Sequence, residues 1–477
     1  MSHLRDEAVF VESPHKCRGT AYPTTDLGNA ERFTDQHLSR LRYCWAKGDW
    51  LAWTGTHWAD DATGDVHRRA AETARSIYRE AADASDSDRR ERLGKWAIAS
   101  ESRSRLDAMI ALARAADGIA IGADELDRQD WLFNCQNVAI DLKTGRPRDH
   151  NPADLITRCA PVKFDPAATA PIFHGFLRRI FSEDDELITF VQRVLGMCLT
   201  GDVREQFLFI CHGQGANGKS VLLDTIAGIM GDYCGAAAPD LLVAKKHGEH
   251  PTELADLQGR RLVVASETEA GAAWRLQLIK RLTGDATIKA RKMRQDFYEF
   301  ARTHKLLVVT NSKPRVVEDS EAVWRRMRLI PFSVVIPPDE RDPHLLDRLK
   351  AEASGILNWL VEGCGAWQVG GLQTPPAVLA ATAEYRDESD PLKDFISDRC
   401  ELDPEAQILT AELRRAYEAH CEENGAKPLG KMRFAEALGR HGCHGGKNWQ
   451  GRIWKGVTLS DSATMTTHDD PARMTRI

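Results

Sequence analysis

The sequence predicts an α/β core that carries a phosphate-binding loop, with a mainly helical domain before it and a winged-helix-like domain after it. Three short apolar runs, Gln206–Cys211, Arg261–Ala265 and Lys305–Thr310, alternate with helical stretches, which is typical of a largely parallel sheet. A glycine-rich loop follows the first run and precedes a helix. Near the C-terminus, two or three helices come before a hairpin around Asn448–Trp454, and this order predicts the winged-helix-like domain.

The domain boundaries follow from length and local composition. A chain of 477 residues suggests about three domains. We predict a flexible N-terminal arm (1–30), a helical domain (31–195), the α/β core with its helical cap (196–372), the winged-helix-like domain (380–460) and a polar tail (461–477). Within the helical domain, residues 66–116 predict two or three amphipathic helices and residues 134–148 predict a hairpin. Four tryptophans between Trp45 and Trp58 indicate a packed cluster, with base stacking as the alternative.

Composition limits the class of protein. Hydrophobic residues make up 42% of the chain and charged residues 28%, which is typical of a globular protein with a real core. The net charge of −6 means that any nucleic-acid site must be a local basic patch. The eleven cysteines form no CxxC pair, and no apolar leader or membrane-length apolar run is present. We therefore expect a cytoplasmic protein with free thiols and no membrane partner.

The phosphate-binding loop is the strongest motif. Residues 213–220 read GQGANGKS and match G-x-x-x-x-G-K-[ST] at every fixed position. In such a loop, glycines bring backbone N–H groups close to phosphate oxygens, Lys219 reaches the β- and γ-phosphates, and Ser220 offers its hydroxyl to Mg²⁺. The predicted cofactors are therefore ATP and Mg²⁺. The predicted nucleotide-binding residues are Gly213, Gly215, Ala216, Asn217, Gly218, Lys219, Ser220 and Val221. The loop alone does not separate kinases, GTPases, transporters and helicases.

Candidate catalytic residues follow the later strands. Glu267 and Glu269 come directly after the second apolar run, where carboxylates can hold Mg²⁺ or polarise the attacking water. Glu267 is the first choice, and the alternative is that one of the two caps the next helix. Asn311 follows the third run and is a candidate sensor of the γ-phosphate, with a turn residue as the alternative. The adjacent Arg325 and Arg326 are candidate arginine fingers or simply surface residues, and the sequence does not choose between the two.

A local basic segment predicts a DNA contact. Between Lys280 and Arg328 there are 13 Lys and Arg residues against 6 Asp and Glu residues. Residues 287–300 within it predict a hairpin on which Lys289, Arg291, Lys292 and Arg294 could face a phosphate backbone. The alternative is a solvated basic face.

The order of these segments resembles that of superfamily III AAA+ helicases. The segments are GQGANGKS, RLVVASETE, IKRLTGDATIKARKM, KLLVVTN and WRRMRLIPF. More closely, they are similar to the phage and plasmid primase–helicase family, which is related to the poxvirus helicase-primase. Flanking segments such as DRQDWLFNCQNVAIDLKTGRPRD and TAEYRDESDPLKDFI extend the resemblance to about 400 residues.

The resemblance implies an AAA+ P-loop ATPase core in a ring oligomer, commonly a hexamer, that hydrolyses ATP between subunits and moves along single-stranded DNA. It implies roles for Lys219 and Ser220 in nucleotide and Mg²⁺ binding, for Glu267 in Mg²⁺ binding and water activation, and for Asn311 as sensor. It implies that Arg325 or Arg326 acts on the neighbouring subunit, and that the hairpin around Lys292 and Met293 grips DNA in the central channel.

One departure and two alternatives remain open. Family members often carry an N-terminal primase domain, for which residues ahead of the helical region leave no room, so we expect no primer synthesis by this chain, and recruitment of a separate primase stays open. The resemblance to phage and plasmid proteins implies a bacterial host cell. The first alternative is an origin-binding initiator ATPase that recognises duplex DNA through residues 391–459, with Arg433, Arg440, Lys447, Arg452 and Lys455 as contacts. The second is a phosphotransferase that is not a motor, which the paired arginines after Asn311 disfavour.

Overall fold

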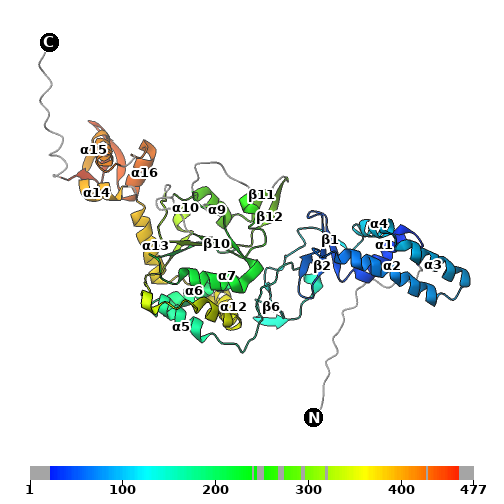
Figure 1. Cartoon of the computed structure of the whole chain (residues 1–477). Helices are drawn as coiled ribbons and strands as arrows, with labels where there is room; N and C mark the ends of the chain where they lie inside the picture. The colour runs from blue at the N-terminus through cyan, green and yellow to red at the C-terminus, as the bar shows by residue number, and fades with distance from the viewer. Residues whose placement is uncertain are drawn as a thin grey trace.

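The structure is a computed structural model that describes residues 22–238, 241–243, 252–266, 273–291, 296–316, 321–390, 392–425 and 428–460 (Figure 1). The N-terminal part begins with helix α1 (Asp26–His37), whose N-cap Thr25 accepts a hydrogen bond from the Gly28 amide. Helix α1 therefore begins ahead of residue 31, within the stretch that we predicted to be a flexible arm. The predicted helices of residues 66–116 are confirmed as α2 (Asp65–Asp83), α3 (Ser87–Ser100) and α4 (Arg103–Ala113).

A small sheet that was not predicted accompanies these helices in the domain predicted to be mainly helical. It has the order β3-β2-β1-β4, with β1 at Leu41–Cys44, β2 at Asp49–Trp53, β3 at Trp58–Asp60 and β4 at Ala120–Ile121. Aromatic residues favour these strands because they pack well on a half-buried pleated surface. Trp50 and Trp58 are buried in this packing, whereas Trp45 is 58% exposed. The predicted aromatic cluster is therefore present, but it is part of a sheet.

A second small sheet contains the predicted hairpin. Strands β5 (Leu132–Asn134), β6 (Ala139–Asp141) and β7 (Arg146–Arg148) pair antiparallel in that order. Gly145, with a φ of +69°, makes the turn between β6 and β7. The 3₁₀ turn Pro152–Asp154 follows.

The central sheet is parallel throughout, as predicted. Its order is β14-β8-β13-β10-β9, formed by β14 (Met327–Pro331), β8 (Leu208–His212), β13 (Lys305–Thr310), β10 (Leu262–Ser266) and β9 (Cys234–Ala236). The register pairs Thr310 with His212 and Val309 with Ser266, so the carboxyl ends of β8, β13 and β10 lie at one edge. This edge is where an α/β sheet binds ligands.

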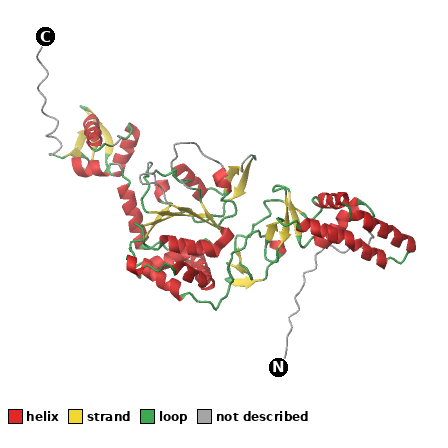
Figure 2. Cartoon of the chain, in the orientation of Figure 1, coloured by secondary structure: helices red, strands yellow, loops and turns green. Residues whose placement is uncertain are grey.

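Helices cover both faces of the central sheet (Figure 2). One face packs against α5 (Pro171–Ile180), α6 (Asp185–Met197), α7 (Lys219–Met230), α11 (Leu345–Ala351) and α12 (Ala353–Gly370). The other carries α8 (Thr252–Ala255), α9 (Leu276–Gly284), α10 (Glu321–Trp324) and the hairpin β11 (Thr287–Arg291)–β12 (Phe297–Ala301). Helix α6 has an acidic N-cap, because the Asp184 carboxylate accepts the Leu187 amide. Helices α5 and α6 share the hydrophobic core of α7 and α12, although they precede the predicted boundary at residue 195.

The C-terminal part has its own core and is joined through α13 (Pro376–Glu388), which packs on strand β14. Its elements are α14 (Lys393–Arg399), β15 (Cys400–Glu401), β16 (Gln407–Leu409), α15 (Thr410–Glu423), α16 (Lys431–Arg440), β17 (His444–Asn448), β18 (Gly451–Lys455) and β19 (Thr458–Leu459). The predicted order of helices followed by a hairpin is confirmed. Across the described ranges, no helix combines the length and the apolar character that a membrane span requires.

Candidate nucleotide and DNA site

The phosphate-binding loop is shaped by backbone conformations that few residues adopt. It runs from the end of β8 to the start of α7, and Gly215, Ala216 and Gly218 have φ values of +97°, +47° and +82°. A Cβ atom at Gly213 would collide with the carbonyl oxygen of Phe332. The loop therefore keeps its backbone amides free of covering side chains, which is what close approach to a phosphate group requires.

The first turn of α7 is weakly capped, because the Lys219 amide donates to Oδ1 of Asn217 at 3.5 Å. Its N-cap is Gly218, which has no side chain to cap the first turn, and Ser220 in that turn is exposed. The N-terminus of a 12-residue helix carries partial positive charge and unpaired N–H donors. An anionic group would satisfy both, so the loop and helix fit a nucleotide phosphate.

Lys219 joins two segments that the sequence analysis had singled out separately. Its side chain is buried, and its Nζ atom donates to the carbonyl oxygen of Gly213 at 2.6 Å and to Oδ1 of Asn217 at 3.2 Å. It also donates to Oδ1 of Asn311, at the end of β13, at 3.1 Å. The predicted loop lysine and the predicted sensor are therefore in direct contact. A phosphate oxygen could replace any of these acceptors without leaving the ammonium unpaired.

The candidate carboxylates cannot be placed in the same way. Glu267 and Glu269 lie outside the described residues, and Ser266, the last described residue of β10, pairs in register with Val309. Their assignment to Mg²⁺ and water therefore stays a prediction. Ser220, the other predicted Mg²⁺ ligand, is exposed at the start of α7, and Val221 follows it in the same turn.

The candidate arginine fingers lie at the opposite end of the sheet from the loop of their own chain. The carbonyl oxygen of Arg326 accepts the Leu208 amide at 2.7 Å, at the first residue of β8, whereas the loop begins after the last one. A five-residue strand spans about 17 Å, which is more than an arginine side chain can reach. Arg325 is exposed beside it. Neither guanidinium can therefore serve the phosphate-binding loop of its own subunit.

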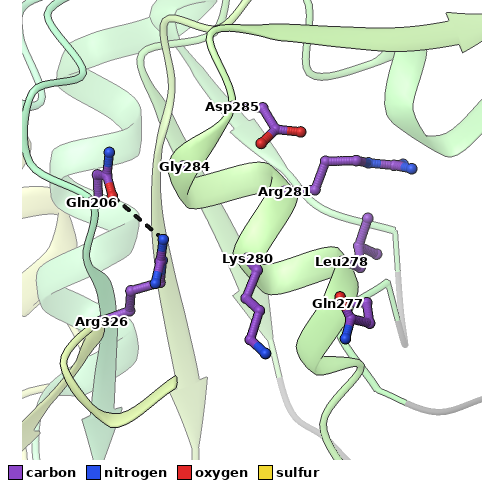
Figure 3. Close-up of a pocket in the computed structure, with 8 residues that line it drawn as sticks. All are labelled: Gln206, Gln277, Leu278, Lys280, Arg281, Gly284, Asp285 and Arg326. Carbon is purple, nitrogen blue, oxygen red and sulfur yellow. Dashed lines mark hydrogen bonds between the residues drawn. The ribbon is translucent and has the colours of Figure 1, made fainter. Parts of the chain in front are cut away.

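A polar cavity of about 490 Å³ lies beside Arg326 (Figure 3). Helix α9 and the segments before β8 and β14 line it with Gln206, Gln277, Leu278, Lys280, Arg281, Gly284, Asp285 and Arg326. The Arg326 guanidinium donates to Gln206 Oε1 at 3.4 Å and to the carbonyl oxygen of Ala322 at 2.7 Å. Burial, and to a smaller extent the neighbouring Arg325, lowers the pKa of Arg326. Three of its side chains are cationic and one is anionic, so the cavity fits an anion.

The predicted basic hairpin is confirmed as β11–β12, and it carries an aromatic residue that the sequence analysis missed. Lys289 and Arg291 are exposed on β11, and Phe297, opposite Arg291, is 51% exposed. The Lys289 ammonium and the Arg291 guanidinium lie 5.4 Å and 5.2 Å from the centre of the Phe297 ring. Lys292, Met293 and Arg294 lie outside the described residues.

This cluster combines two exposed cations with a half-exposed ring, which is the pairing of residue types that can bind phosphates and stack on a base. Phe297 could not be predicted as part of this cluster, because only the register of the two strands places it opposite Arg291. Gln206, Lys280 and Arg281 were also missed as site residues, because only the fold brings them beside Arg326.

Three family models match successive parts of the chain. Residues 30–182 match the model described as D5 N terminal like, and residues 387–469 match the model described as poxvirus D5 protein-like. Residues 211–326, which include the loop and the candidate fingers, match a family of unknown function.

Curated relatives come from large DNA viruses. A protein of Acanthamoeba polyphaga mimivirus with a provisional helicase name is 29% identical over 296 residues, which are 57% of this chain and 31% of that protein. A protein of Frog virus 3, also provisionally named a helicase, is 24% identical over 58% of this chain and 30% of its own length. A protein of African swine fever virus with a provisional primase name is 22% identical over 61% of this chain and 33% of its own length. The chain thus spans about a third of the length of these relatives.

Among solved structures, the apo form of the NrS-1 C-terminal region aligns with a TM-score of 0.44 and 13% sequence identity, over 76% of this chain and 74% of that one. The two D5 models flank the central region that holds the phosphate-binding loop. The D5 models at both ends of the chain and the viral relatives together support the D5-like primase–helicase family, within superfamily III helicases, as the family of this chain.

Proposed function

We propose that this chain is an ATP-dependent DNA helicase of a viral, phage or plasmid replication system. It acts as a ring oligomer, in which ATP is hydrolysed between subunits to drive movement along single-stranded DNA. The proposal rests on the placement of the candidate site residues at two opposite ends of the central sheet. Lys219 and Asn311 meet at one end of the sheet, and the arginines lie at the other end.

The loop end of the sheet binds the nucleotide. The amides at the start of α7 and the Lys219 ammonium bind the β- and γ-phosphates of ATP, and Asn311 responds to the γ-phosphate through its contact with Lys219. Ser220 and Glu267 hold Mg²⁺, which supplies charge neutralisation at the phosphates when it is bound. Glu267, with Glu269 as second choice, orients and deprotonates the attacking water.

The arginine end completes the site of the next subunit. Because Arg325 and Arg326 cannot reach their own loop, we assign one of them to the γ-phosphate of a neighbour in a head-to-tail ring. Lys280 and Arg281 on α9 extend the same cationic surface and attract the neighbour's nucleotide. An AAA+ ring, commonly a hexamer, is the assembly that this division favours.

The β11–β12 hairpin contacts the DNA strand. Lys289 and Arg291 bind phosphates, together with Lys292 and Arg294 near the tip, while Phe297 and Met293 contact bases. The relatives named above come from viruses of eukaryotes, so the bacterial host remains a prediction.

The test is ATP turnover by the purified chain with and without single-stranded DNA, measured for wild type and Lys219→Ala. We expect stimulation by DNA that fades with salt, and at least a 100-fold loss in the variant. The surface variant Lys350→Ala, on helix α11, should behave as wild type. Turnover that ignores single strands would contradict the helicase assignment.

A second candidate function, origin recognition through duplex DNA, is favoured by charge segregation in the C-terminal part. Residues 431–455 carry six Lys and Arg residues against one Glu, and all six are exposed on α16 and the β17–β18 hairpin. Trp449 at the hairpin turn is 90% exposed. Residues 392–425 carry an excess of Asp and Glu instead. Helix and hairpin then form the winged-helix-like module that contacts duplex DNA.

Lys447 and Arg452 lie directly opposite each other in that hairpin, so the double variant Lys447→Ala/Arg452→Ala removes adjacent cations. If duplex binding is the main task, this variant loses specific duplex affinity while its DNA-stimulated ATP turnover persists. Unchanged duplex affinity would rule the second function out.

A further inference from the structure

Tyr385 on helix α13 lies where three segments of the proposed site converge. The residue is 2% exposed, and its hydroxyl accepts a hydrogen bond from Nε1 of Trp274 at 2.7 Å. The same hydroxyl donates to the carbonyl oxygen of Pro314. Its ring meets that of Trp324 edge-to-face, with ring centres 5.3 Å apart. One buried phenol therefore joins three segments that are distant in sequence.

Each of these segments belongs to a different part of the proposed ATP site. Pro314 follows the sensor Asn311 by three residues, and Trp324 directly precedes Arg325. Trp274 lies downstream of β10, and its amide donates to the carbonyl oxygen of Arg315 at 3.0 Å. Tyr385 thus links the segment that senses the subunit's own nucleotide to the segment that reaches the neighbour's.

Neighbouring contacts reinforce the same link. Lys313 forms an ion pair with Glu388 of α13 at 2.8 Å, and Arg386 forms one with Glu321 of α10 at 3.1 Å. Lys313 is on the sensor segment, and Glu321 is on the segment that carries the arginines. Burial raises the pKa of the Tyr385 phenol, so its proton remains available for donation. Helix α13 is therefore bound to both segments by ion pairs of two residues that closely follow Tyr385.

We infer that Tyr385 is a positioning residue that couples the two nucleotide sites each subunit touches, so that the state of its own ATP sets the position of the arginine it offers to its neighbour. The inference rests on the proposed function, since it requires ATP hydrolysis between subunits. A shift of the sensor segment moves Pro314, and the buried phenol transmits the shift to Trp324 and the adjacent arginines. Packed side chains with fixed hydrogen bonds carry such coupling.

The test compares Tyr385→Phe with Tyr233→Phe. Tyr233 is also buried, and its hydroxyl also has two partners, the Asn134 amide at 3.3 Å and the Arg158 carbonyl oxygen at 3.5 Å, but it touches none of the three segments. We expect Tyr385→Phe to lower kcat about tenfold with KM for ATP nearly unchanged, because the ring packing and the loop remain. We also expect the Hill coefficient for ATP to fall from above one to about one.

Tyr233→Phe should keep the kcat and the Hill coefficient of wild type, and both variants should melt within a few degrees of each other. Equal loss of kcat in both variants would reduce Tyr385 to a packing residue and overturn the inference. A wild type that hydrolyses ATP without cooperativity would also overturn it. A wild type that does not hydrolyse ATP would instead refute the proposed function.

A second test uses Trp274→Phe, which removes the indole N–H donor and retains an aromatic ring. If the phenol acts through Trp274, the double variant with Tyr385→Phe loses no more kcat than Tyr385→Phe alone. Losses that multiply would show that the two residues act independently.

Discussion

His304 is a buried imidazole whose protonation the fold opposes. It lies between Arg302 and Lys305, and within the described chain neither of its ring nitrogens has a hydrogen-bond partner. Burial, reinforced by the two neighbouring cations, lowers its pKa to about 3. The unfolded chain, with a pKa near 6.5, therefore binds more protons between about pH 3 and pH 6.5, so the free energy of unfolding falls as the pH drops through this window.

This argument predicts the behaviour of His304→Leu, which fills a similar volume without a titratable group. Between pH 7 and pH 4.5, wild type should lose roughly 2–3 kcal/mol more free energy of unfolding than the variant. Urea titrations of both proteins at the two pH values measure the difference. Equal losses would mean that His304 is protonated at no cost in the folded chain.

Two buried lysines illustrate what residue-level sequence reasoning can and cannot predict. Lys219 was predicted as a site residue because the motif around it fixes its role, and its contact with Asn311 agrees. Lys305 is also buried, with its ammonium donating to the Thr200 carbonyl oxygen, and burial lowers its pKa to about 8. Nothing near Lys305 in the sequence predicts this burial, since the Thr200 and Asp202 carbonyl oxygens that accept from it lie about a hundred residues away, and the Thr303 carbonyl oxygen is its one local partner among the described residues. The role of a residue can be predicted from the sequence when a local motif sets it. It cannot be predicted when backbone groups distant in the sequence set it.

At the scale of elements, the N-cap of helix α7 and its last turn each hold a glycine, and substitution by alanine should have opposite effects on stability at the two positions. Gly218 has a φ of +82°, and a Cβ atom there would lie 2.5 Å from Cγ2 of Ile180. Gly218→Ala should therefore weaken binding of a fluorescent ATP analogue at least tenfold and lower the melting temperature. Gly228, in the last turn of α7, has no atom within 4 Å of such a Cβ beyond the helix's own nearby backbone.

Gly228→Ala is the matched control, and it should raise the free energy of unfolding by about 0.5–1 kcal/mol without changing nucleotide binding. Similar loss of nucleotide binding in both variants would mean that the loop conformation is not what binds the phosphates.

The β11–β12 hairpin predicts a characteristic salt dependence. If Lys289 and Arg291 each neutralise one phosphate, the double alanine variant should reduce the slope of log affinity for single-stranded DNA against log salt by about 1.4. Phe297→Ala should weaken binding about tenfold at every salt concentration, with the slope unchanged, because stacking releases no counterions.

Fluorescence anisotropy over a potassium chloride series measures both effects. Glu299, which pairs with Lys289 across the hairpin, gives the control, and Glu299→Ala should leave the slope as in wild type. An unchanged slope in the double variant would remove this hairpin from the DNA interface.

Elements were predictable where their sequence pattern was long enough. Three of the five parallel core strands, β8, β10 and β13, and helices α2 to α4 were predicted, because each carries an extended apolar pattern. The strands β9 and β14 were not predicted. The N-terminal sheet was not predicted because its strands are two to five residues long. In addition, a tryptophan-rich sequence has the same pattern whether its residues pack in strands or in loops. Strand pairs such as β1 with β4 join residues about 80 positions apart, which no local pattern encodes.

At the scale of the whole molecule, the family follows from the order of motifs, and the flanking D5 models confirm the resemblance predicted from that order. The opposite placement of Lys219 and the paired arginines could not be read from sequence, since it depends on the direction of β8 and β14 in one sheet. That placement leads to the central claim, which is that a complete ATP site requires two subunits.

The most direct test mixes two inactive proteins, Lys219→Ala and the double variant Arg325→Ala/Arg326→Ala, and measures ATP turnover over a range of ratios. In an equal mixture, about one interface in four combines an intact loop with an intact arginine from its neighbour. We predict that turnover returns to about a quarter of the wild-type rate. Mixtures that stay inactive at every ratio, although the two proteins assemble together, would contradict the account.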